Sequence, residues 1–185
     1  DWQQEPQIII ERGKGSFLVD TRGKKYLDGV SSLWVTVHGH RKKEIDQAVA
    51  RQIRKIAHST LLGLSNVPAV LLAEKLVTIA PKGLSRVFYS DSGSTAVEIA
   101  LKMAFQYWQQ KGPQYQRKTG FLSLTEAYHG DTLGAVSVGG IDLFHSIYKP
   151  LLFQTRKVES PFCYRCRLGL TWPMCQMTCL MHAER

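Results

Sequence analysis

The chain has no uninterrupted apolar run of membrane-spanning length and no cysteine before position 163, and each absence excludes a class of protein. An apolar stretch at 68–80 is interrupted by Glu74 and Lys75, so we expect no membrane span. The first residues lack a basic stretch followed by an apolar one, which is the pattern of a secretory signal. We therefore expect a cytoplasmic protein with reduced thiols and no membrane partner.

Positive charge is abundant, with a formal net charge of +9, but it is dispersed along the chain. The basic residues fall in separate clusters, and aromatic residues are not interleaved with them. A surface that binds nucleic acid would combine the two kinds of side chain. We therefore interpret the clusters as solvated surface and expect no nucleic-acid partner.

Hydrophobic periodicity predicts an α/β fold. Short apolar runs and turns predict an antiparallel β-meander over residues 8–27, with helices following at 45–56, at 66–79 and at 94–110. The runs at 86–90 and 120–124 are predicted strands, and strand, helix and strand in this order are typical of a parallel crossover. We expect an N-terminal β-rich segment followed by a mainly parallel sheet.

Ser92, Gly93 and Ser94 lie between a predicted strand and the most regular predicted helix. The first N–H groups of a helix have no internal acceptor, and the helix dipole favours an anion there. Gly93 would let the backbone approach a phosphate, yet the same residues would serve equally well as an ordinary helix cap. No GK[ST] follows and GxGxxG is absent, which excludes a Walker P-loop and a dinucleotide fingerprint. Both interpretations stay open.

Residues 127–131, Ala-Tyr-His-Gly-Asp, follow the next predicted strand. Ligands of an open parallel sheet bind beyond the carboxyl ends of its strands, so this segment and residues 92–94 are expected to share one site. Tyr128 could stack on a planar ligand, and His129 could form a hydrogen bond beside it. Each could also be an ordinary loop residue.

Two further segments carry side chains that could bind a ligand. In the first, residues 31–40, Trp34 could line an apolar pocket or belong to a core. His38 and His40 of the same segment could ligate a metal, but the spacing of the sequence indicates no third ligand. The other group is a cluster of four thiols whose x2, x8 and x3 spacing departs from that of a zinc ribbon. We favour a loop of reduced thiols over a zinc site for Cys163, Cys166, Cys175 and Cys179.

Three segments together resemble the class III, fold-type I, pyridoxal-phosphate (PLP) aminotransferases: LDGVSSLWVTVHGH, SRVFYSDSGSTAVEIALKMAFQYWQQKG and FLSLTEAYHGDTLGAVSVGG. The resemblance runs from about Ile8 to Phe153. It implies that residues 1–60 are the meander and helix of the small domain. Residues 61–159 would be part of the PLP-binding large domain, and residues 160–185 its Cys-rich irregular tail.

The resemblance also implies roles for individual residues. Gly93 and Ser94, with Ser92 beside them, match the cradle of the cofactor phosphate, and Tyr128 matches the aromatic residue that lies against the pyridoxal ring and borders the substrate. Trp34 matches a substrate-pocket position, and Leu33 stands where some relatives have a second Trp. The family's Schiff-base lysine matches no residue here, so we expect no catalytic residue in this chain, which would be an N-terminal fragment that is inactive alone.

The members that serve biotin synthesis are the most similar, so the implied reaction is transamination of 7-keto-8-aminopelargonate to 7,8-diaminopelargonate. The partners would be that keto acceptor and an amino donor, S-adenosylmethionine or lysine, in a homodimer when the chain is complete. Two alternatives stay open: another class III ω-aminotransferase, and a non-catalytic fragment that binds phosphate or a partner.

Overall fold

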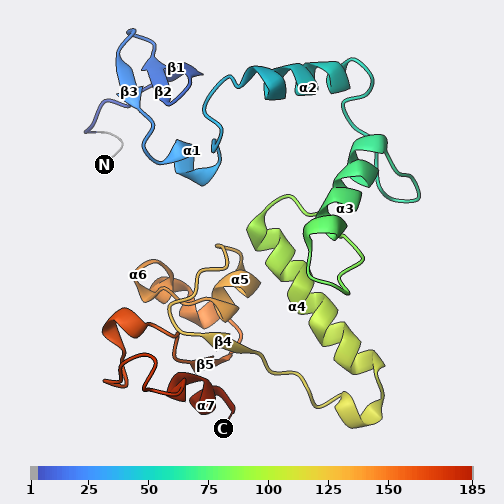
Figure 1. The fold of residues 1–185 in the computed structure, drawn as a ribbon, viewed down its shortest axis with the longest axis vertical. Helices are drawn as coiled ribbons and strands as arrows, with labels where there is room; N and C mark the ends of the chain where they lie inside the picture. Colours follow the sequence, from blue (N-terminus) through green and yellow to red (C-terminus); the bar gives the residue numbers. More distant parts are fainter. Residues whose placement is uncertain (1–3, 185) are drawn as a thin grey trace. The chain divides into compact units, whose positions relative to one another are not determined.

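A computed structural model describes residues 4–184 and divides the chain into two compact units, residues 1–85 and 86–185 (Figure 1). The first unit holds a three-stranded sheet and three helical segments, and the second holds a parallel strand pair with the remaining helices. The class is therefore mixed α/β, with one small antiparallel sheet and one parallel sheet. The predicted assignment of residues 1–60, 61–159 and 160–185 to domains of a larger enzyme remains a prediction.

The predicted meander is confirmed as an antiparallel sheet in the order β1-β2-β3. The turn after β2 is closed by Asp20, whose carboxylate accepts hydrogen bonds from the backbone N–H groups of Arg22 and Lys24, both at 2.9 Å, and from the Tyr26 hydroxyl at 3.0 Å. Gly23 has a φ of +81° in this turn, which glycine adopts without strain. The strands are β1 (Ile10–Lys14), β2 (Phe17–Asp20) and β3 (Lys25–Leu27).

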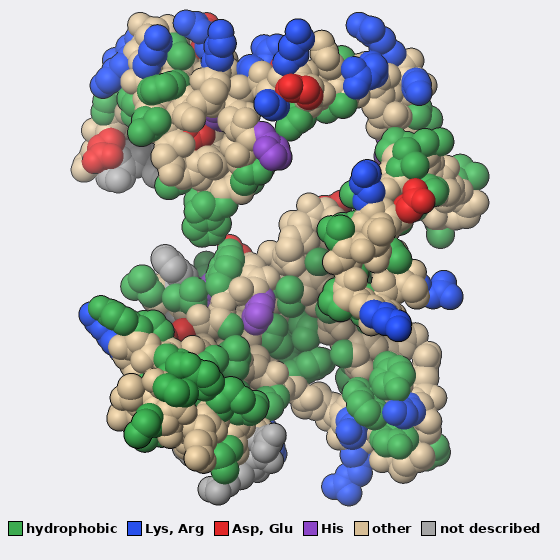
Figure 2. Space-filling view, in the orientation of Figure 1, with side chains coloured by type: hydrophobic (Ala, Val, Ile, Leu, Met, Phe, Trp, Pro, Cys, Tyr) green, Lys and Arg blue, Asp and Glu red, His purple; other side chains and the backbone are tan. Residues whose placement is uncertain are grey.

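The helical segments of the first unit are α1 (Ser31–Trp34), α2 (Lys43–Ile53) and α3 (Val67–Ile79). The predicted helices at 45–56 and 66–79 are thus confirmed within a few residues. The Asn66 side chain caps α3 by accepting a hydrogen bond from the backbone N–H of Ala69 at 3.0 Å, and the helix ends before Pro81. Figure 2 shows lysines and arginines over the sheet and α2, and their interpretation as solvated surface stays a prediction.

The second unit begins with the long helix α4 (Gly93–Gln110), which the sequence predicts over 94–110. The strands β4 (Leu122–Leu124) and β5 (Arg156–Val158) pair in parallel, with Ser123 opposite Lys157. Helices supply the crossover between them, as a parallel pair requires. The remaining elements are η1 (Pro113–Tyr115), α5 (Leu133–Val138), α6 (Asp142–His145), η2 (Ser146–Leu151), η3 (Cys163–Arg165) and α7 (Thr178–Glu184).

The strand predicted at 86–90 is not formed, and this corrects the expected crossover. Residues 86–90 have no regular secondary structure, whereas the predicted strand at 120–124 appears as β4. A strand exists only where a neighbour accepts and donates its ladder hydrogen bonds, and no described segment pairs with 86–90. The parallel pair is instead β4 with β5, a strand that the sequence analysis did not predict.

Buried apolar residues are few. Among the described side chains the buried apolar ones are Val19 in the first unit, and Ala135, Val136 and Val138 in the second. No residue of α4 is buried, although Met103, Phe105 and Tyr107 lie on it. The buried apolar residues of the second unit therefore lie on α5. Within residues 4–184, no helix is long and apolar enough to cross a membrane.

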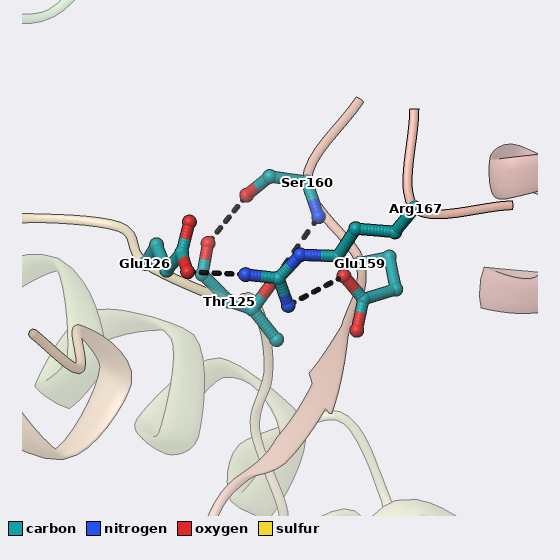
Figure 3. A network of polar contacts seen from close by, with 5 residues as sticks. All are labelled: Thr125, Glu126, Glu159, Ser160 and Arg167. Atoms are coloured by element: carbon teal, nitrogen blue, oxygen red, sulfur yellow. Dashed lines mark hydrogen bonds and ion pairs between the residues drawn. The ribbon is translucent and has the colours of Figure 1, made fainter. Parts of the chain in front are cut away.

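Polar contacts join the Cys-rich tail to the loop after β4 (Figure 3). Arg167 donates to Glu159 at 3.1 Å and also pairs with Glu126. The backbone N–H of Ser160 donates to the Thr125 hydroxyl at 3.2 Å, and the Ser160 hydroxyl donates to the Thr125 carbonyl. The tail thus holds the chain immediately before Ala127, where the candidate site begins.

Candidate active site

The N-terminus of α4 is built by a capping box. The Ser92 hydroxyl accepts a hydrogen bond from the backbone N–H of Thr95 at 3.3 Å, and the Thr95 hydroxyl accepts one from the backbone N–H of Ser92 at 3.0 Å. Gly93 is the first helical residue, and a Cβ atom there would meet nothing within 4 Å. Ser92 is thus committed to capping, while the space beside Gly93 could admit a small anion.

Ser94 lies against the loop that follows β4. A Cβ atom on Gly130 would lie only 2.0 Å from Ser94 Oγ, so position 130 has no room for a side chain. Gly130 also has a φ of +113°, which residues with side chains rarely adopt. The structure thus brings residues 92–94 and 127–131 together, as their positions after two successive predicted strands suggested.

Glu98 makes a second contact between α4 and this part of the chain. Its carboxylate accepts hydrogen bonds from the backbone N–H groups of Gly134 at 2.7 Å and Ala135 at 3.3 Å, in the first turn of α5. The Thr132 hydroxyl, and then these two N–H groups, lower the pKa of Glu98, although burial opposes them. A charged carboxylate from one helix therefore caps the next one.

Asp131 joins two aromatic rings. The Tyr128 hydroxyl donates to Asp131 Oδ2 at 2.8 Å, and His145 Nε2 lies 3.2 Å from Asp131 Oδ1. The rings of Tyr128 and His145 are stacked, with centroids 6.5 Å apart and planes inclined by 12°. The hydrogen bond from Tyr128 lowers the pKa of Asp131 most, and the contact with His145 lowers it further. The hydrogen bond between Tyr128 and Asp131 also raises the pKa of Tyr128. Because Tyr128 is 52% exposed, its oriented ring can still meet a ligand.

Two residues of this arrangement, Glu98 and His145, were not identified from the sequence. The predicted histidine, His129, has an exposed side chain, whereas His145 is the histidine that contacts Tyr128 and Asp131. No local pattern identifies either missed residue, because their partners lie 36 and 14 positions away along the chain. A carboxylate within one helix and a histidine at the end of another are otherwise ordinary.

Lys157 holds the other end of α5. Its ammonium group donates to the carbonyls of Ser137 at 3.3 Å, Val138 at 3.1 Å and Gly139, and to the Ser123 hydroxyl at 2.9 Å. Partial burial lowers the pKa of Lys157. A cation at the C-terminal end of a helix complements its dipole, so these contacts give Lys157 a structural role.

Leu33 and Trp34, the predicted substrate-pocket residues, belong to the first unit and lie on α1. The φ angles of Ser31, Ser32, Leu33 and Trp34 are +51°, +48°, +63° and +69°, so α1 is a left-handed turn. This conformation costs roughly 1–2 kcal/mol per residue for L-amino acids. The side chains of Leu33 and Trp34 are 70% and 74% exposed, so neither belongs to a core in the described structure.

His40, which the sequence left possible as a metal ligand, contacts a carboxylate in the structure. Its Nε2 lies 2.8 Å from Asp28 Oδ2, and its backbone exchanges hydrogen bonds of 3.0 and 2.8 Å with that of Gly15. His38 is exposed. Among the described side chains, no three His, Cys, Asp or Glu residues form a group that could hold a metal ion.

The four cysteines are free thiols that line one cavity of about 30 Å³. Phe162, Leu170 and Trp172 line it as well, so its wall is largely apolar. The thiols share a cavity without a metal-binding arrangement, and the part of the chain that the structure describes thus gives no support to a zinc site.

Comparison with known proteins identifies the class. Residues 1–169 match the family described as aminotransferase class-III. The chain therefore belongs to the class-III aminotransferase family, as the three resembling segments implied. The match includes the whole first unit, the second unit as far as residue 169, and every residue of the candidate site.

Individual members of the family share more than half of their aligned residues with this chain. The chain is 53% identical over its whole length to the adenosylmethionine-8-amino-7-oxononanoate aminotransferase of Geobacter sulfurreducens, of which it spans 41%. It is 58% identical over 89% of its length to the protein of that name from Anoxybacillus flavithermus, of which it spans 36%. The chain is thus considerably shorter than these curated relatives.

Solved aminotransferase structures resemble the fold of this chain. The crystal structure of the adenosylmethionine-8-amino-7-oxononanoate aminotransferase from Methanocaldococcus jannaschii matches 86% of the chain with a TM-score of 0.81 and 53% identity, and the match covers 36% of that structure. A PLP-bound amine transaminase from an uncultivated Pseudomonas species matches 99% of the chain with a TM-score of 0.86 and 34% identity, covering 41% of its own chain. The fold is therefore that of part of an aminotransferase.

Proposed function

We propose that the full-length protein is a PLP-dependent aminotransferase of biotin synthesis, which converts 7-keto-8-aminopelargonate to 7,8-diaminopelargonate. Support comes from 53% identity over the whole chain to a relative named for the same reaction. The structural observation that carries the proposal is the contact between Ser94 and Gly130, because it joins the two segments that such a cofactor would need. The residues described would belong mostly to the large, cofactor-binding domain of a fold-type I enzyme.

The residues at the start of α4 fit the phosphate of PLP. Gly93 has open space beside it, the first helical turn offers N–H groups, and the Ser94 hydroxyl can donate to an anion. The half-exposed ring of Tyr128 would lie against the pyridine ring, with Asp131 fixing its hydroxyl. The bound cofactor supplies an electron sink for amino transfer, whereas the protein supplies position and proton transfer. Ser92 would act through the cap rather than by contact with the phosphate.

Trp34 and Leu33 would line the substrate pocket, as the family resemblance implies. The keto acceptor is 7-keto-8-aminopelargonate, and the amino donor would be S-adenosylmethionine or lysine. We expect the complete enzyme to be a cytoplasmic homodimer. The reactive amine would come from outside these 185 residues, since the resemblance places the Schiff-base lysine downstream and Lys157 is held by carbonyl groups.

The experiment is to purify the full-length protein, add PLP and follow its absorption, then supply 7-keto-8-aminopelargonate with each amino donor. We expect a cofactor band and formation of 7,8-diaminopelargonate. Absence of the band, or a band without this product, would contradict the proposal. The chain of 185 residues, expressed alone, is expected to give no turnover.

A second candidate is an ω-aminotransferase with a different substrate. The TM-score of 0.86 to an amine transaminase favours it. A panel of amines and common keto acids distinguishes the two. Turnover of these compounds with none of 7-keto-8-aminopelargonate would favour the second candidate.

A further inference from the structure

The turn Ser31–Trp34 is left-handed in four successive residues, none of which is glycine. Backbone hydrogen bonds close it, since the N–H of Trp34 donates to the Val30 carbonyl at 2.7 Å and that of Val35 to the Ser31 carbonyl at 3.0 Å. L-amino acids normally visit this conformation singly, and a strained run persists only where its surroundings impose it. Some neighbouring group must therefore hold the turn.

Asp28 is that group. Its Oδ1 accepts a hydrogen bond from the backbone N–H of Ser32 at 2.8 Å, and its Oδ2 accepts one from the Ser32 hydroxyl at 2.8 Å. His40 Nε2 lies 2.8 Å from the same Oδ2, which fixes the carboxylate from the other side. Only 5% of the Asp28 side chain is exposed. Three partners thus fix this largely covered carboxylate, and it cannot turn away without breaking these hydrogen bonds.

The held turn presents two large apolar side chains outward. Leu33 and Trp34 are 70% and 74% exposed, although residues of these types are usually buried to a large extent. The handedness of the backbone sets the direction of each Cα–Cβ bond, so a right-handed turn would project these side chains differently. The conformation of the turn therefore decides what Leu33 and Trp34 can contact.

We propose that Asp28 is a positioning residue for substrate recognition, which holds Ser31–Trp34 left-handed and so aims Leu33 and Trp34 at the apolar part of a substrate. This role rests on the proposed function, in which these two side chains line the substrate pocket. An aliphatic and an aromatic side chain offer apolar contact without charge, so the ligand class is a molecule with an extended methylene chain. The keto acceptor 7-keto-8-aminopelargonate has such a chain, and its binding should depend on Asp28.

The test compares Asp28→Ala with Asp20→Ala in the full-length enzyme loaded with PLP. Asp20 is a matched control because it is also buried, in the same unit, and closes a turn by accepting three hydrogen bonds, but that turn carries neither Leu33 nor Trp34. We expect Asp28→Ala to raise the KM for 7-keto-8-aminopelargonate on the order of tenfold to a hundredfold, with a much smaller change in kcat and an unchanged PLP band. Asp20→Ala should lower the melting temperature and leave this KM unchanged.

A rescue variant separates the turn from other effects of Asp28. Glycine adopts the left-handed conformation without strain, so Ser32→Gly alone should have nearly the wild-type KM. The double variant Asp28→Ala/Ser32→Gly should recover part of the lost affinity for the keto acceptor. Equilibrium binding of the keto acceptor, followed by tryptophan fluorescence, measures this affinity without turnover. The variants should rank in the same order by their dissociation constants as by their KM values.

Where Asp28→Ala does not fold, Asp28→Asn takes its place, because it retains one acceptor oxygen and should give a smaller increase in KM. Wild-type acceptor binding in whichever of these variants folds would overturn the proposal. An equal KM increase in Asp20→Ala would overturn it as well, since the effect would then arise from lost stability. A folded wild-type enzyme without a PLP band or product contradicts the proposed function itself, whereas an active wild type with unaffected Asp28 variants contradicts the positioning role alone.

Discussion

The two units hold their exposed aromatic residues by different means. In the first unit, Asp28 fixes the turn of Trp34 through partners that are 4 and 12 positions away along the chain. In the second unit, the segment that carries Tyr128 lies against Ser94 of α4 at Gly130, and the hydrogen bond from Gly134 to Glu98, just beyond this segment, spans 36 positions. The first arrangement forms within one short segment, whereas the second requires two elements to meet.

An aspartate and a histidine occur in both arrangements, with their exposure reversed. The Asp28 side chain is 5% exposed beside His40 at 18%, and the Asp131 side chain is 72% exposed beside His145 at 8%. Asp28 accepts a hydrogen bond from a backbone N–H and so shapes the main chain, while the exposed Asp131 accepts one from the Tyr128 hydroxyl, lies beside His145 and so orients a ring. Asp28 variants should therefore alter substrate binding, and variants around Tyr128 should alter the response of the cofactor.

The largest effect that would sharpen this contrast is expected at Ser94. In the full-length enzyme, Ser94→Asp should weaken PLP binding about a hundredfold or more, because a carboxylate would face the phosphate at short range. Ser94→Asn has nearly the same size and no charge, and it should weaken binding much less. PLP titration followed by absorption measures both constants. Equal, small losses would mean that Ser94 serves only the helix start, since Asp also suits that position.

A smaller effect is expected at Tyr128. Tyr128→Ala removes the ring that Asp131 and His145 orient and should lower kcat/KM on the order of a hundredfold, while the melting temperature changes little because the side chain is half-exposed. Tyr128→Phe keeps the ring, loses the bond to Asp131 and should lower kcat/KM on the order of tenfold or less. Steady-state kinetics with both substrates checks the series. Wild-type activity in Tyr128→Ala would remove Tyr128 from the site.

The smallest effect concerns stability and pH at Glu98. Because the pKa of Glu98 is lowered on folding, the charged carboxylate stabilises the fold above its ordinary pKa of 4.5, and this contribution is lost as the pH falls through the lower folded value. Glu98→Gln should lower the free energy of unfolding by about 1 kcal/mol at neutral pH. Urea unfolding at several pH values should show the difference from wild type closing below pH 4.5.

The matched control for Glu98 is Glu74→Gln, on the exposed surface of α3. This variant should unfold like the wild type at every pH, because the Glu74 side chain does not cap another helix. A difference between wild type and Glu98→Gln that is independent of pH would contradict the capping role of the Glu98 carboxylate.

Much of the secondary structure was predictable because its causes are local. The caps at Asn66 and Ser92, the helix end before Pro81 and the turn at Gly23 each depend on residues within a few positions. The strand at 86–90 was predicted wrongly, because an apolar run indicates a strand only when a neighbour is present to pair with it. The partner that β4 does have, β5, lies more than thirty positions further along.

The candidate site was predictable in part. Its two segments were named from their places after successive predicted strands, and the contact between Ser94 and Gly130 confirmed that they meet. The capping role of Glu98 and the stacking of His145 on Tyr128 could not be predicted, since each depends on the distance between elements rather than on any local pattern.

The sequence by itself determined the meander, the long helices, their caps and the family, because hydrophobic period, turn chemistry and motif spacing are properties of short segments. Only the tertiary structure decided which carboxylate caps α5, which histidine orients Tyr128 and that Ser31–Trp34 is left-handed. The physical reason is that a strained turn and a shared cap are stable only when partners elsewhere in the fold satisfy them.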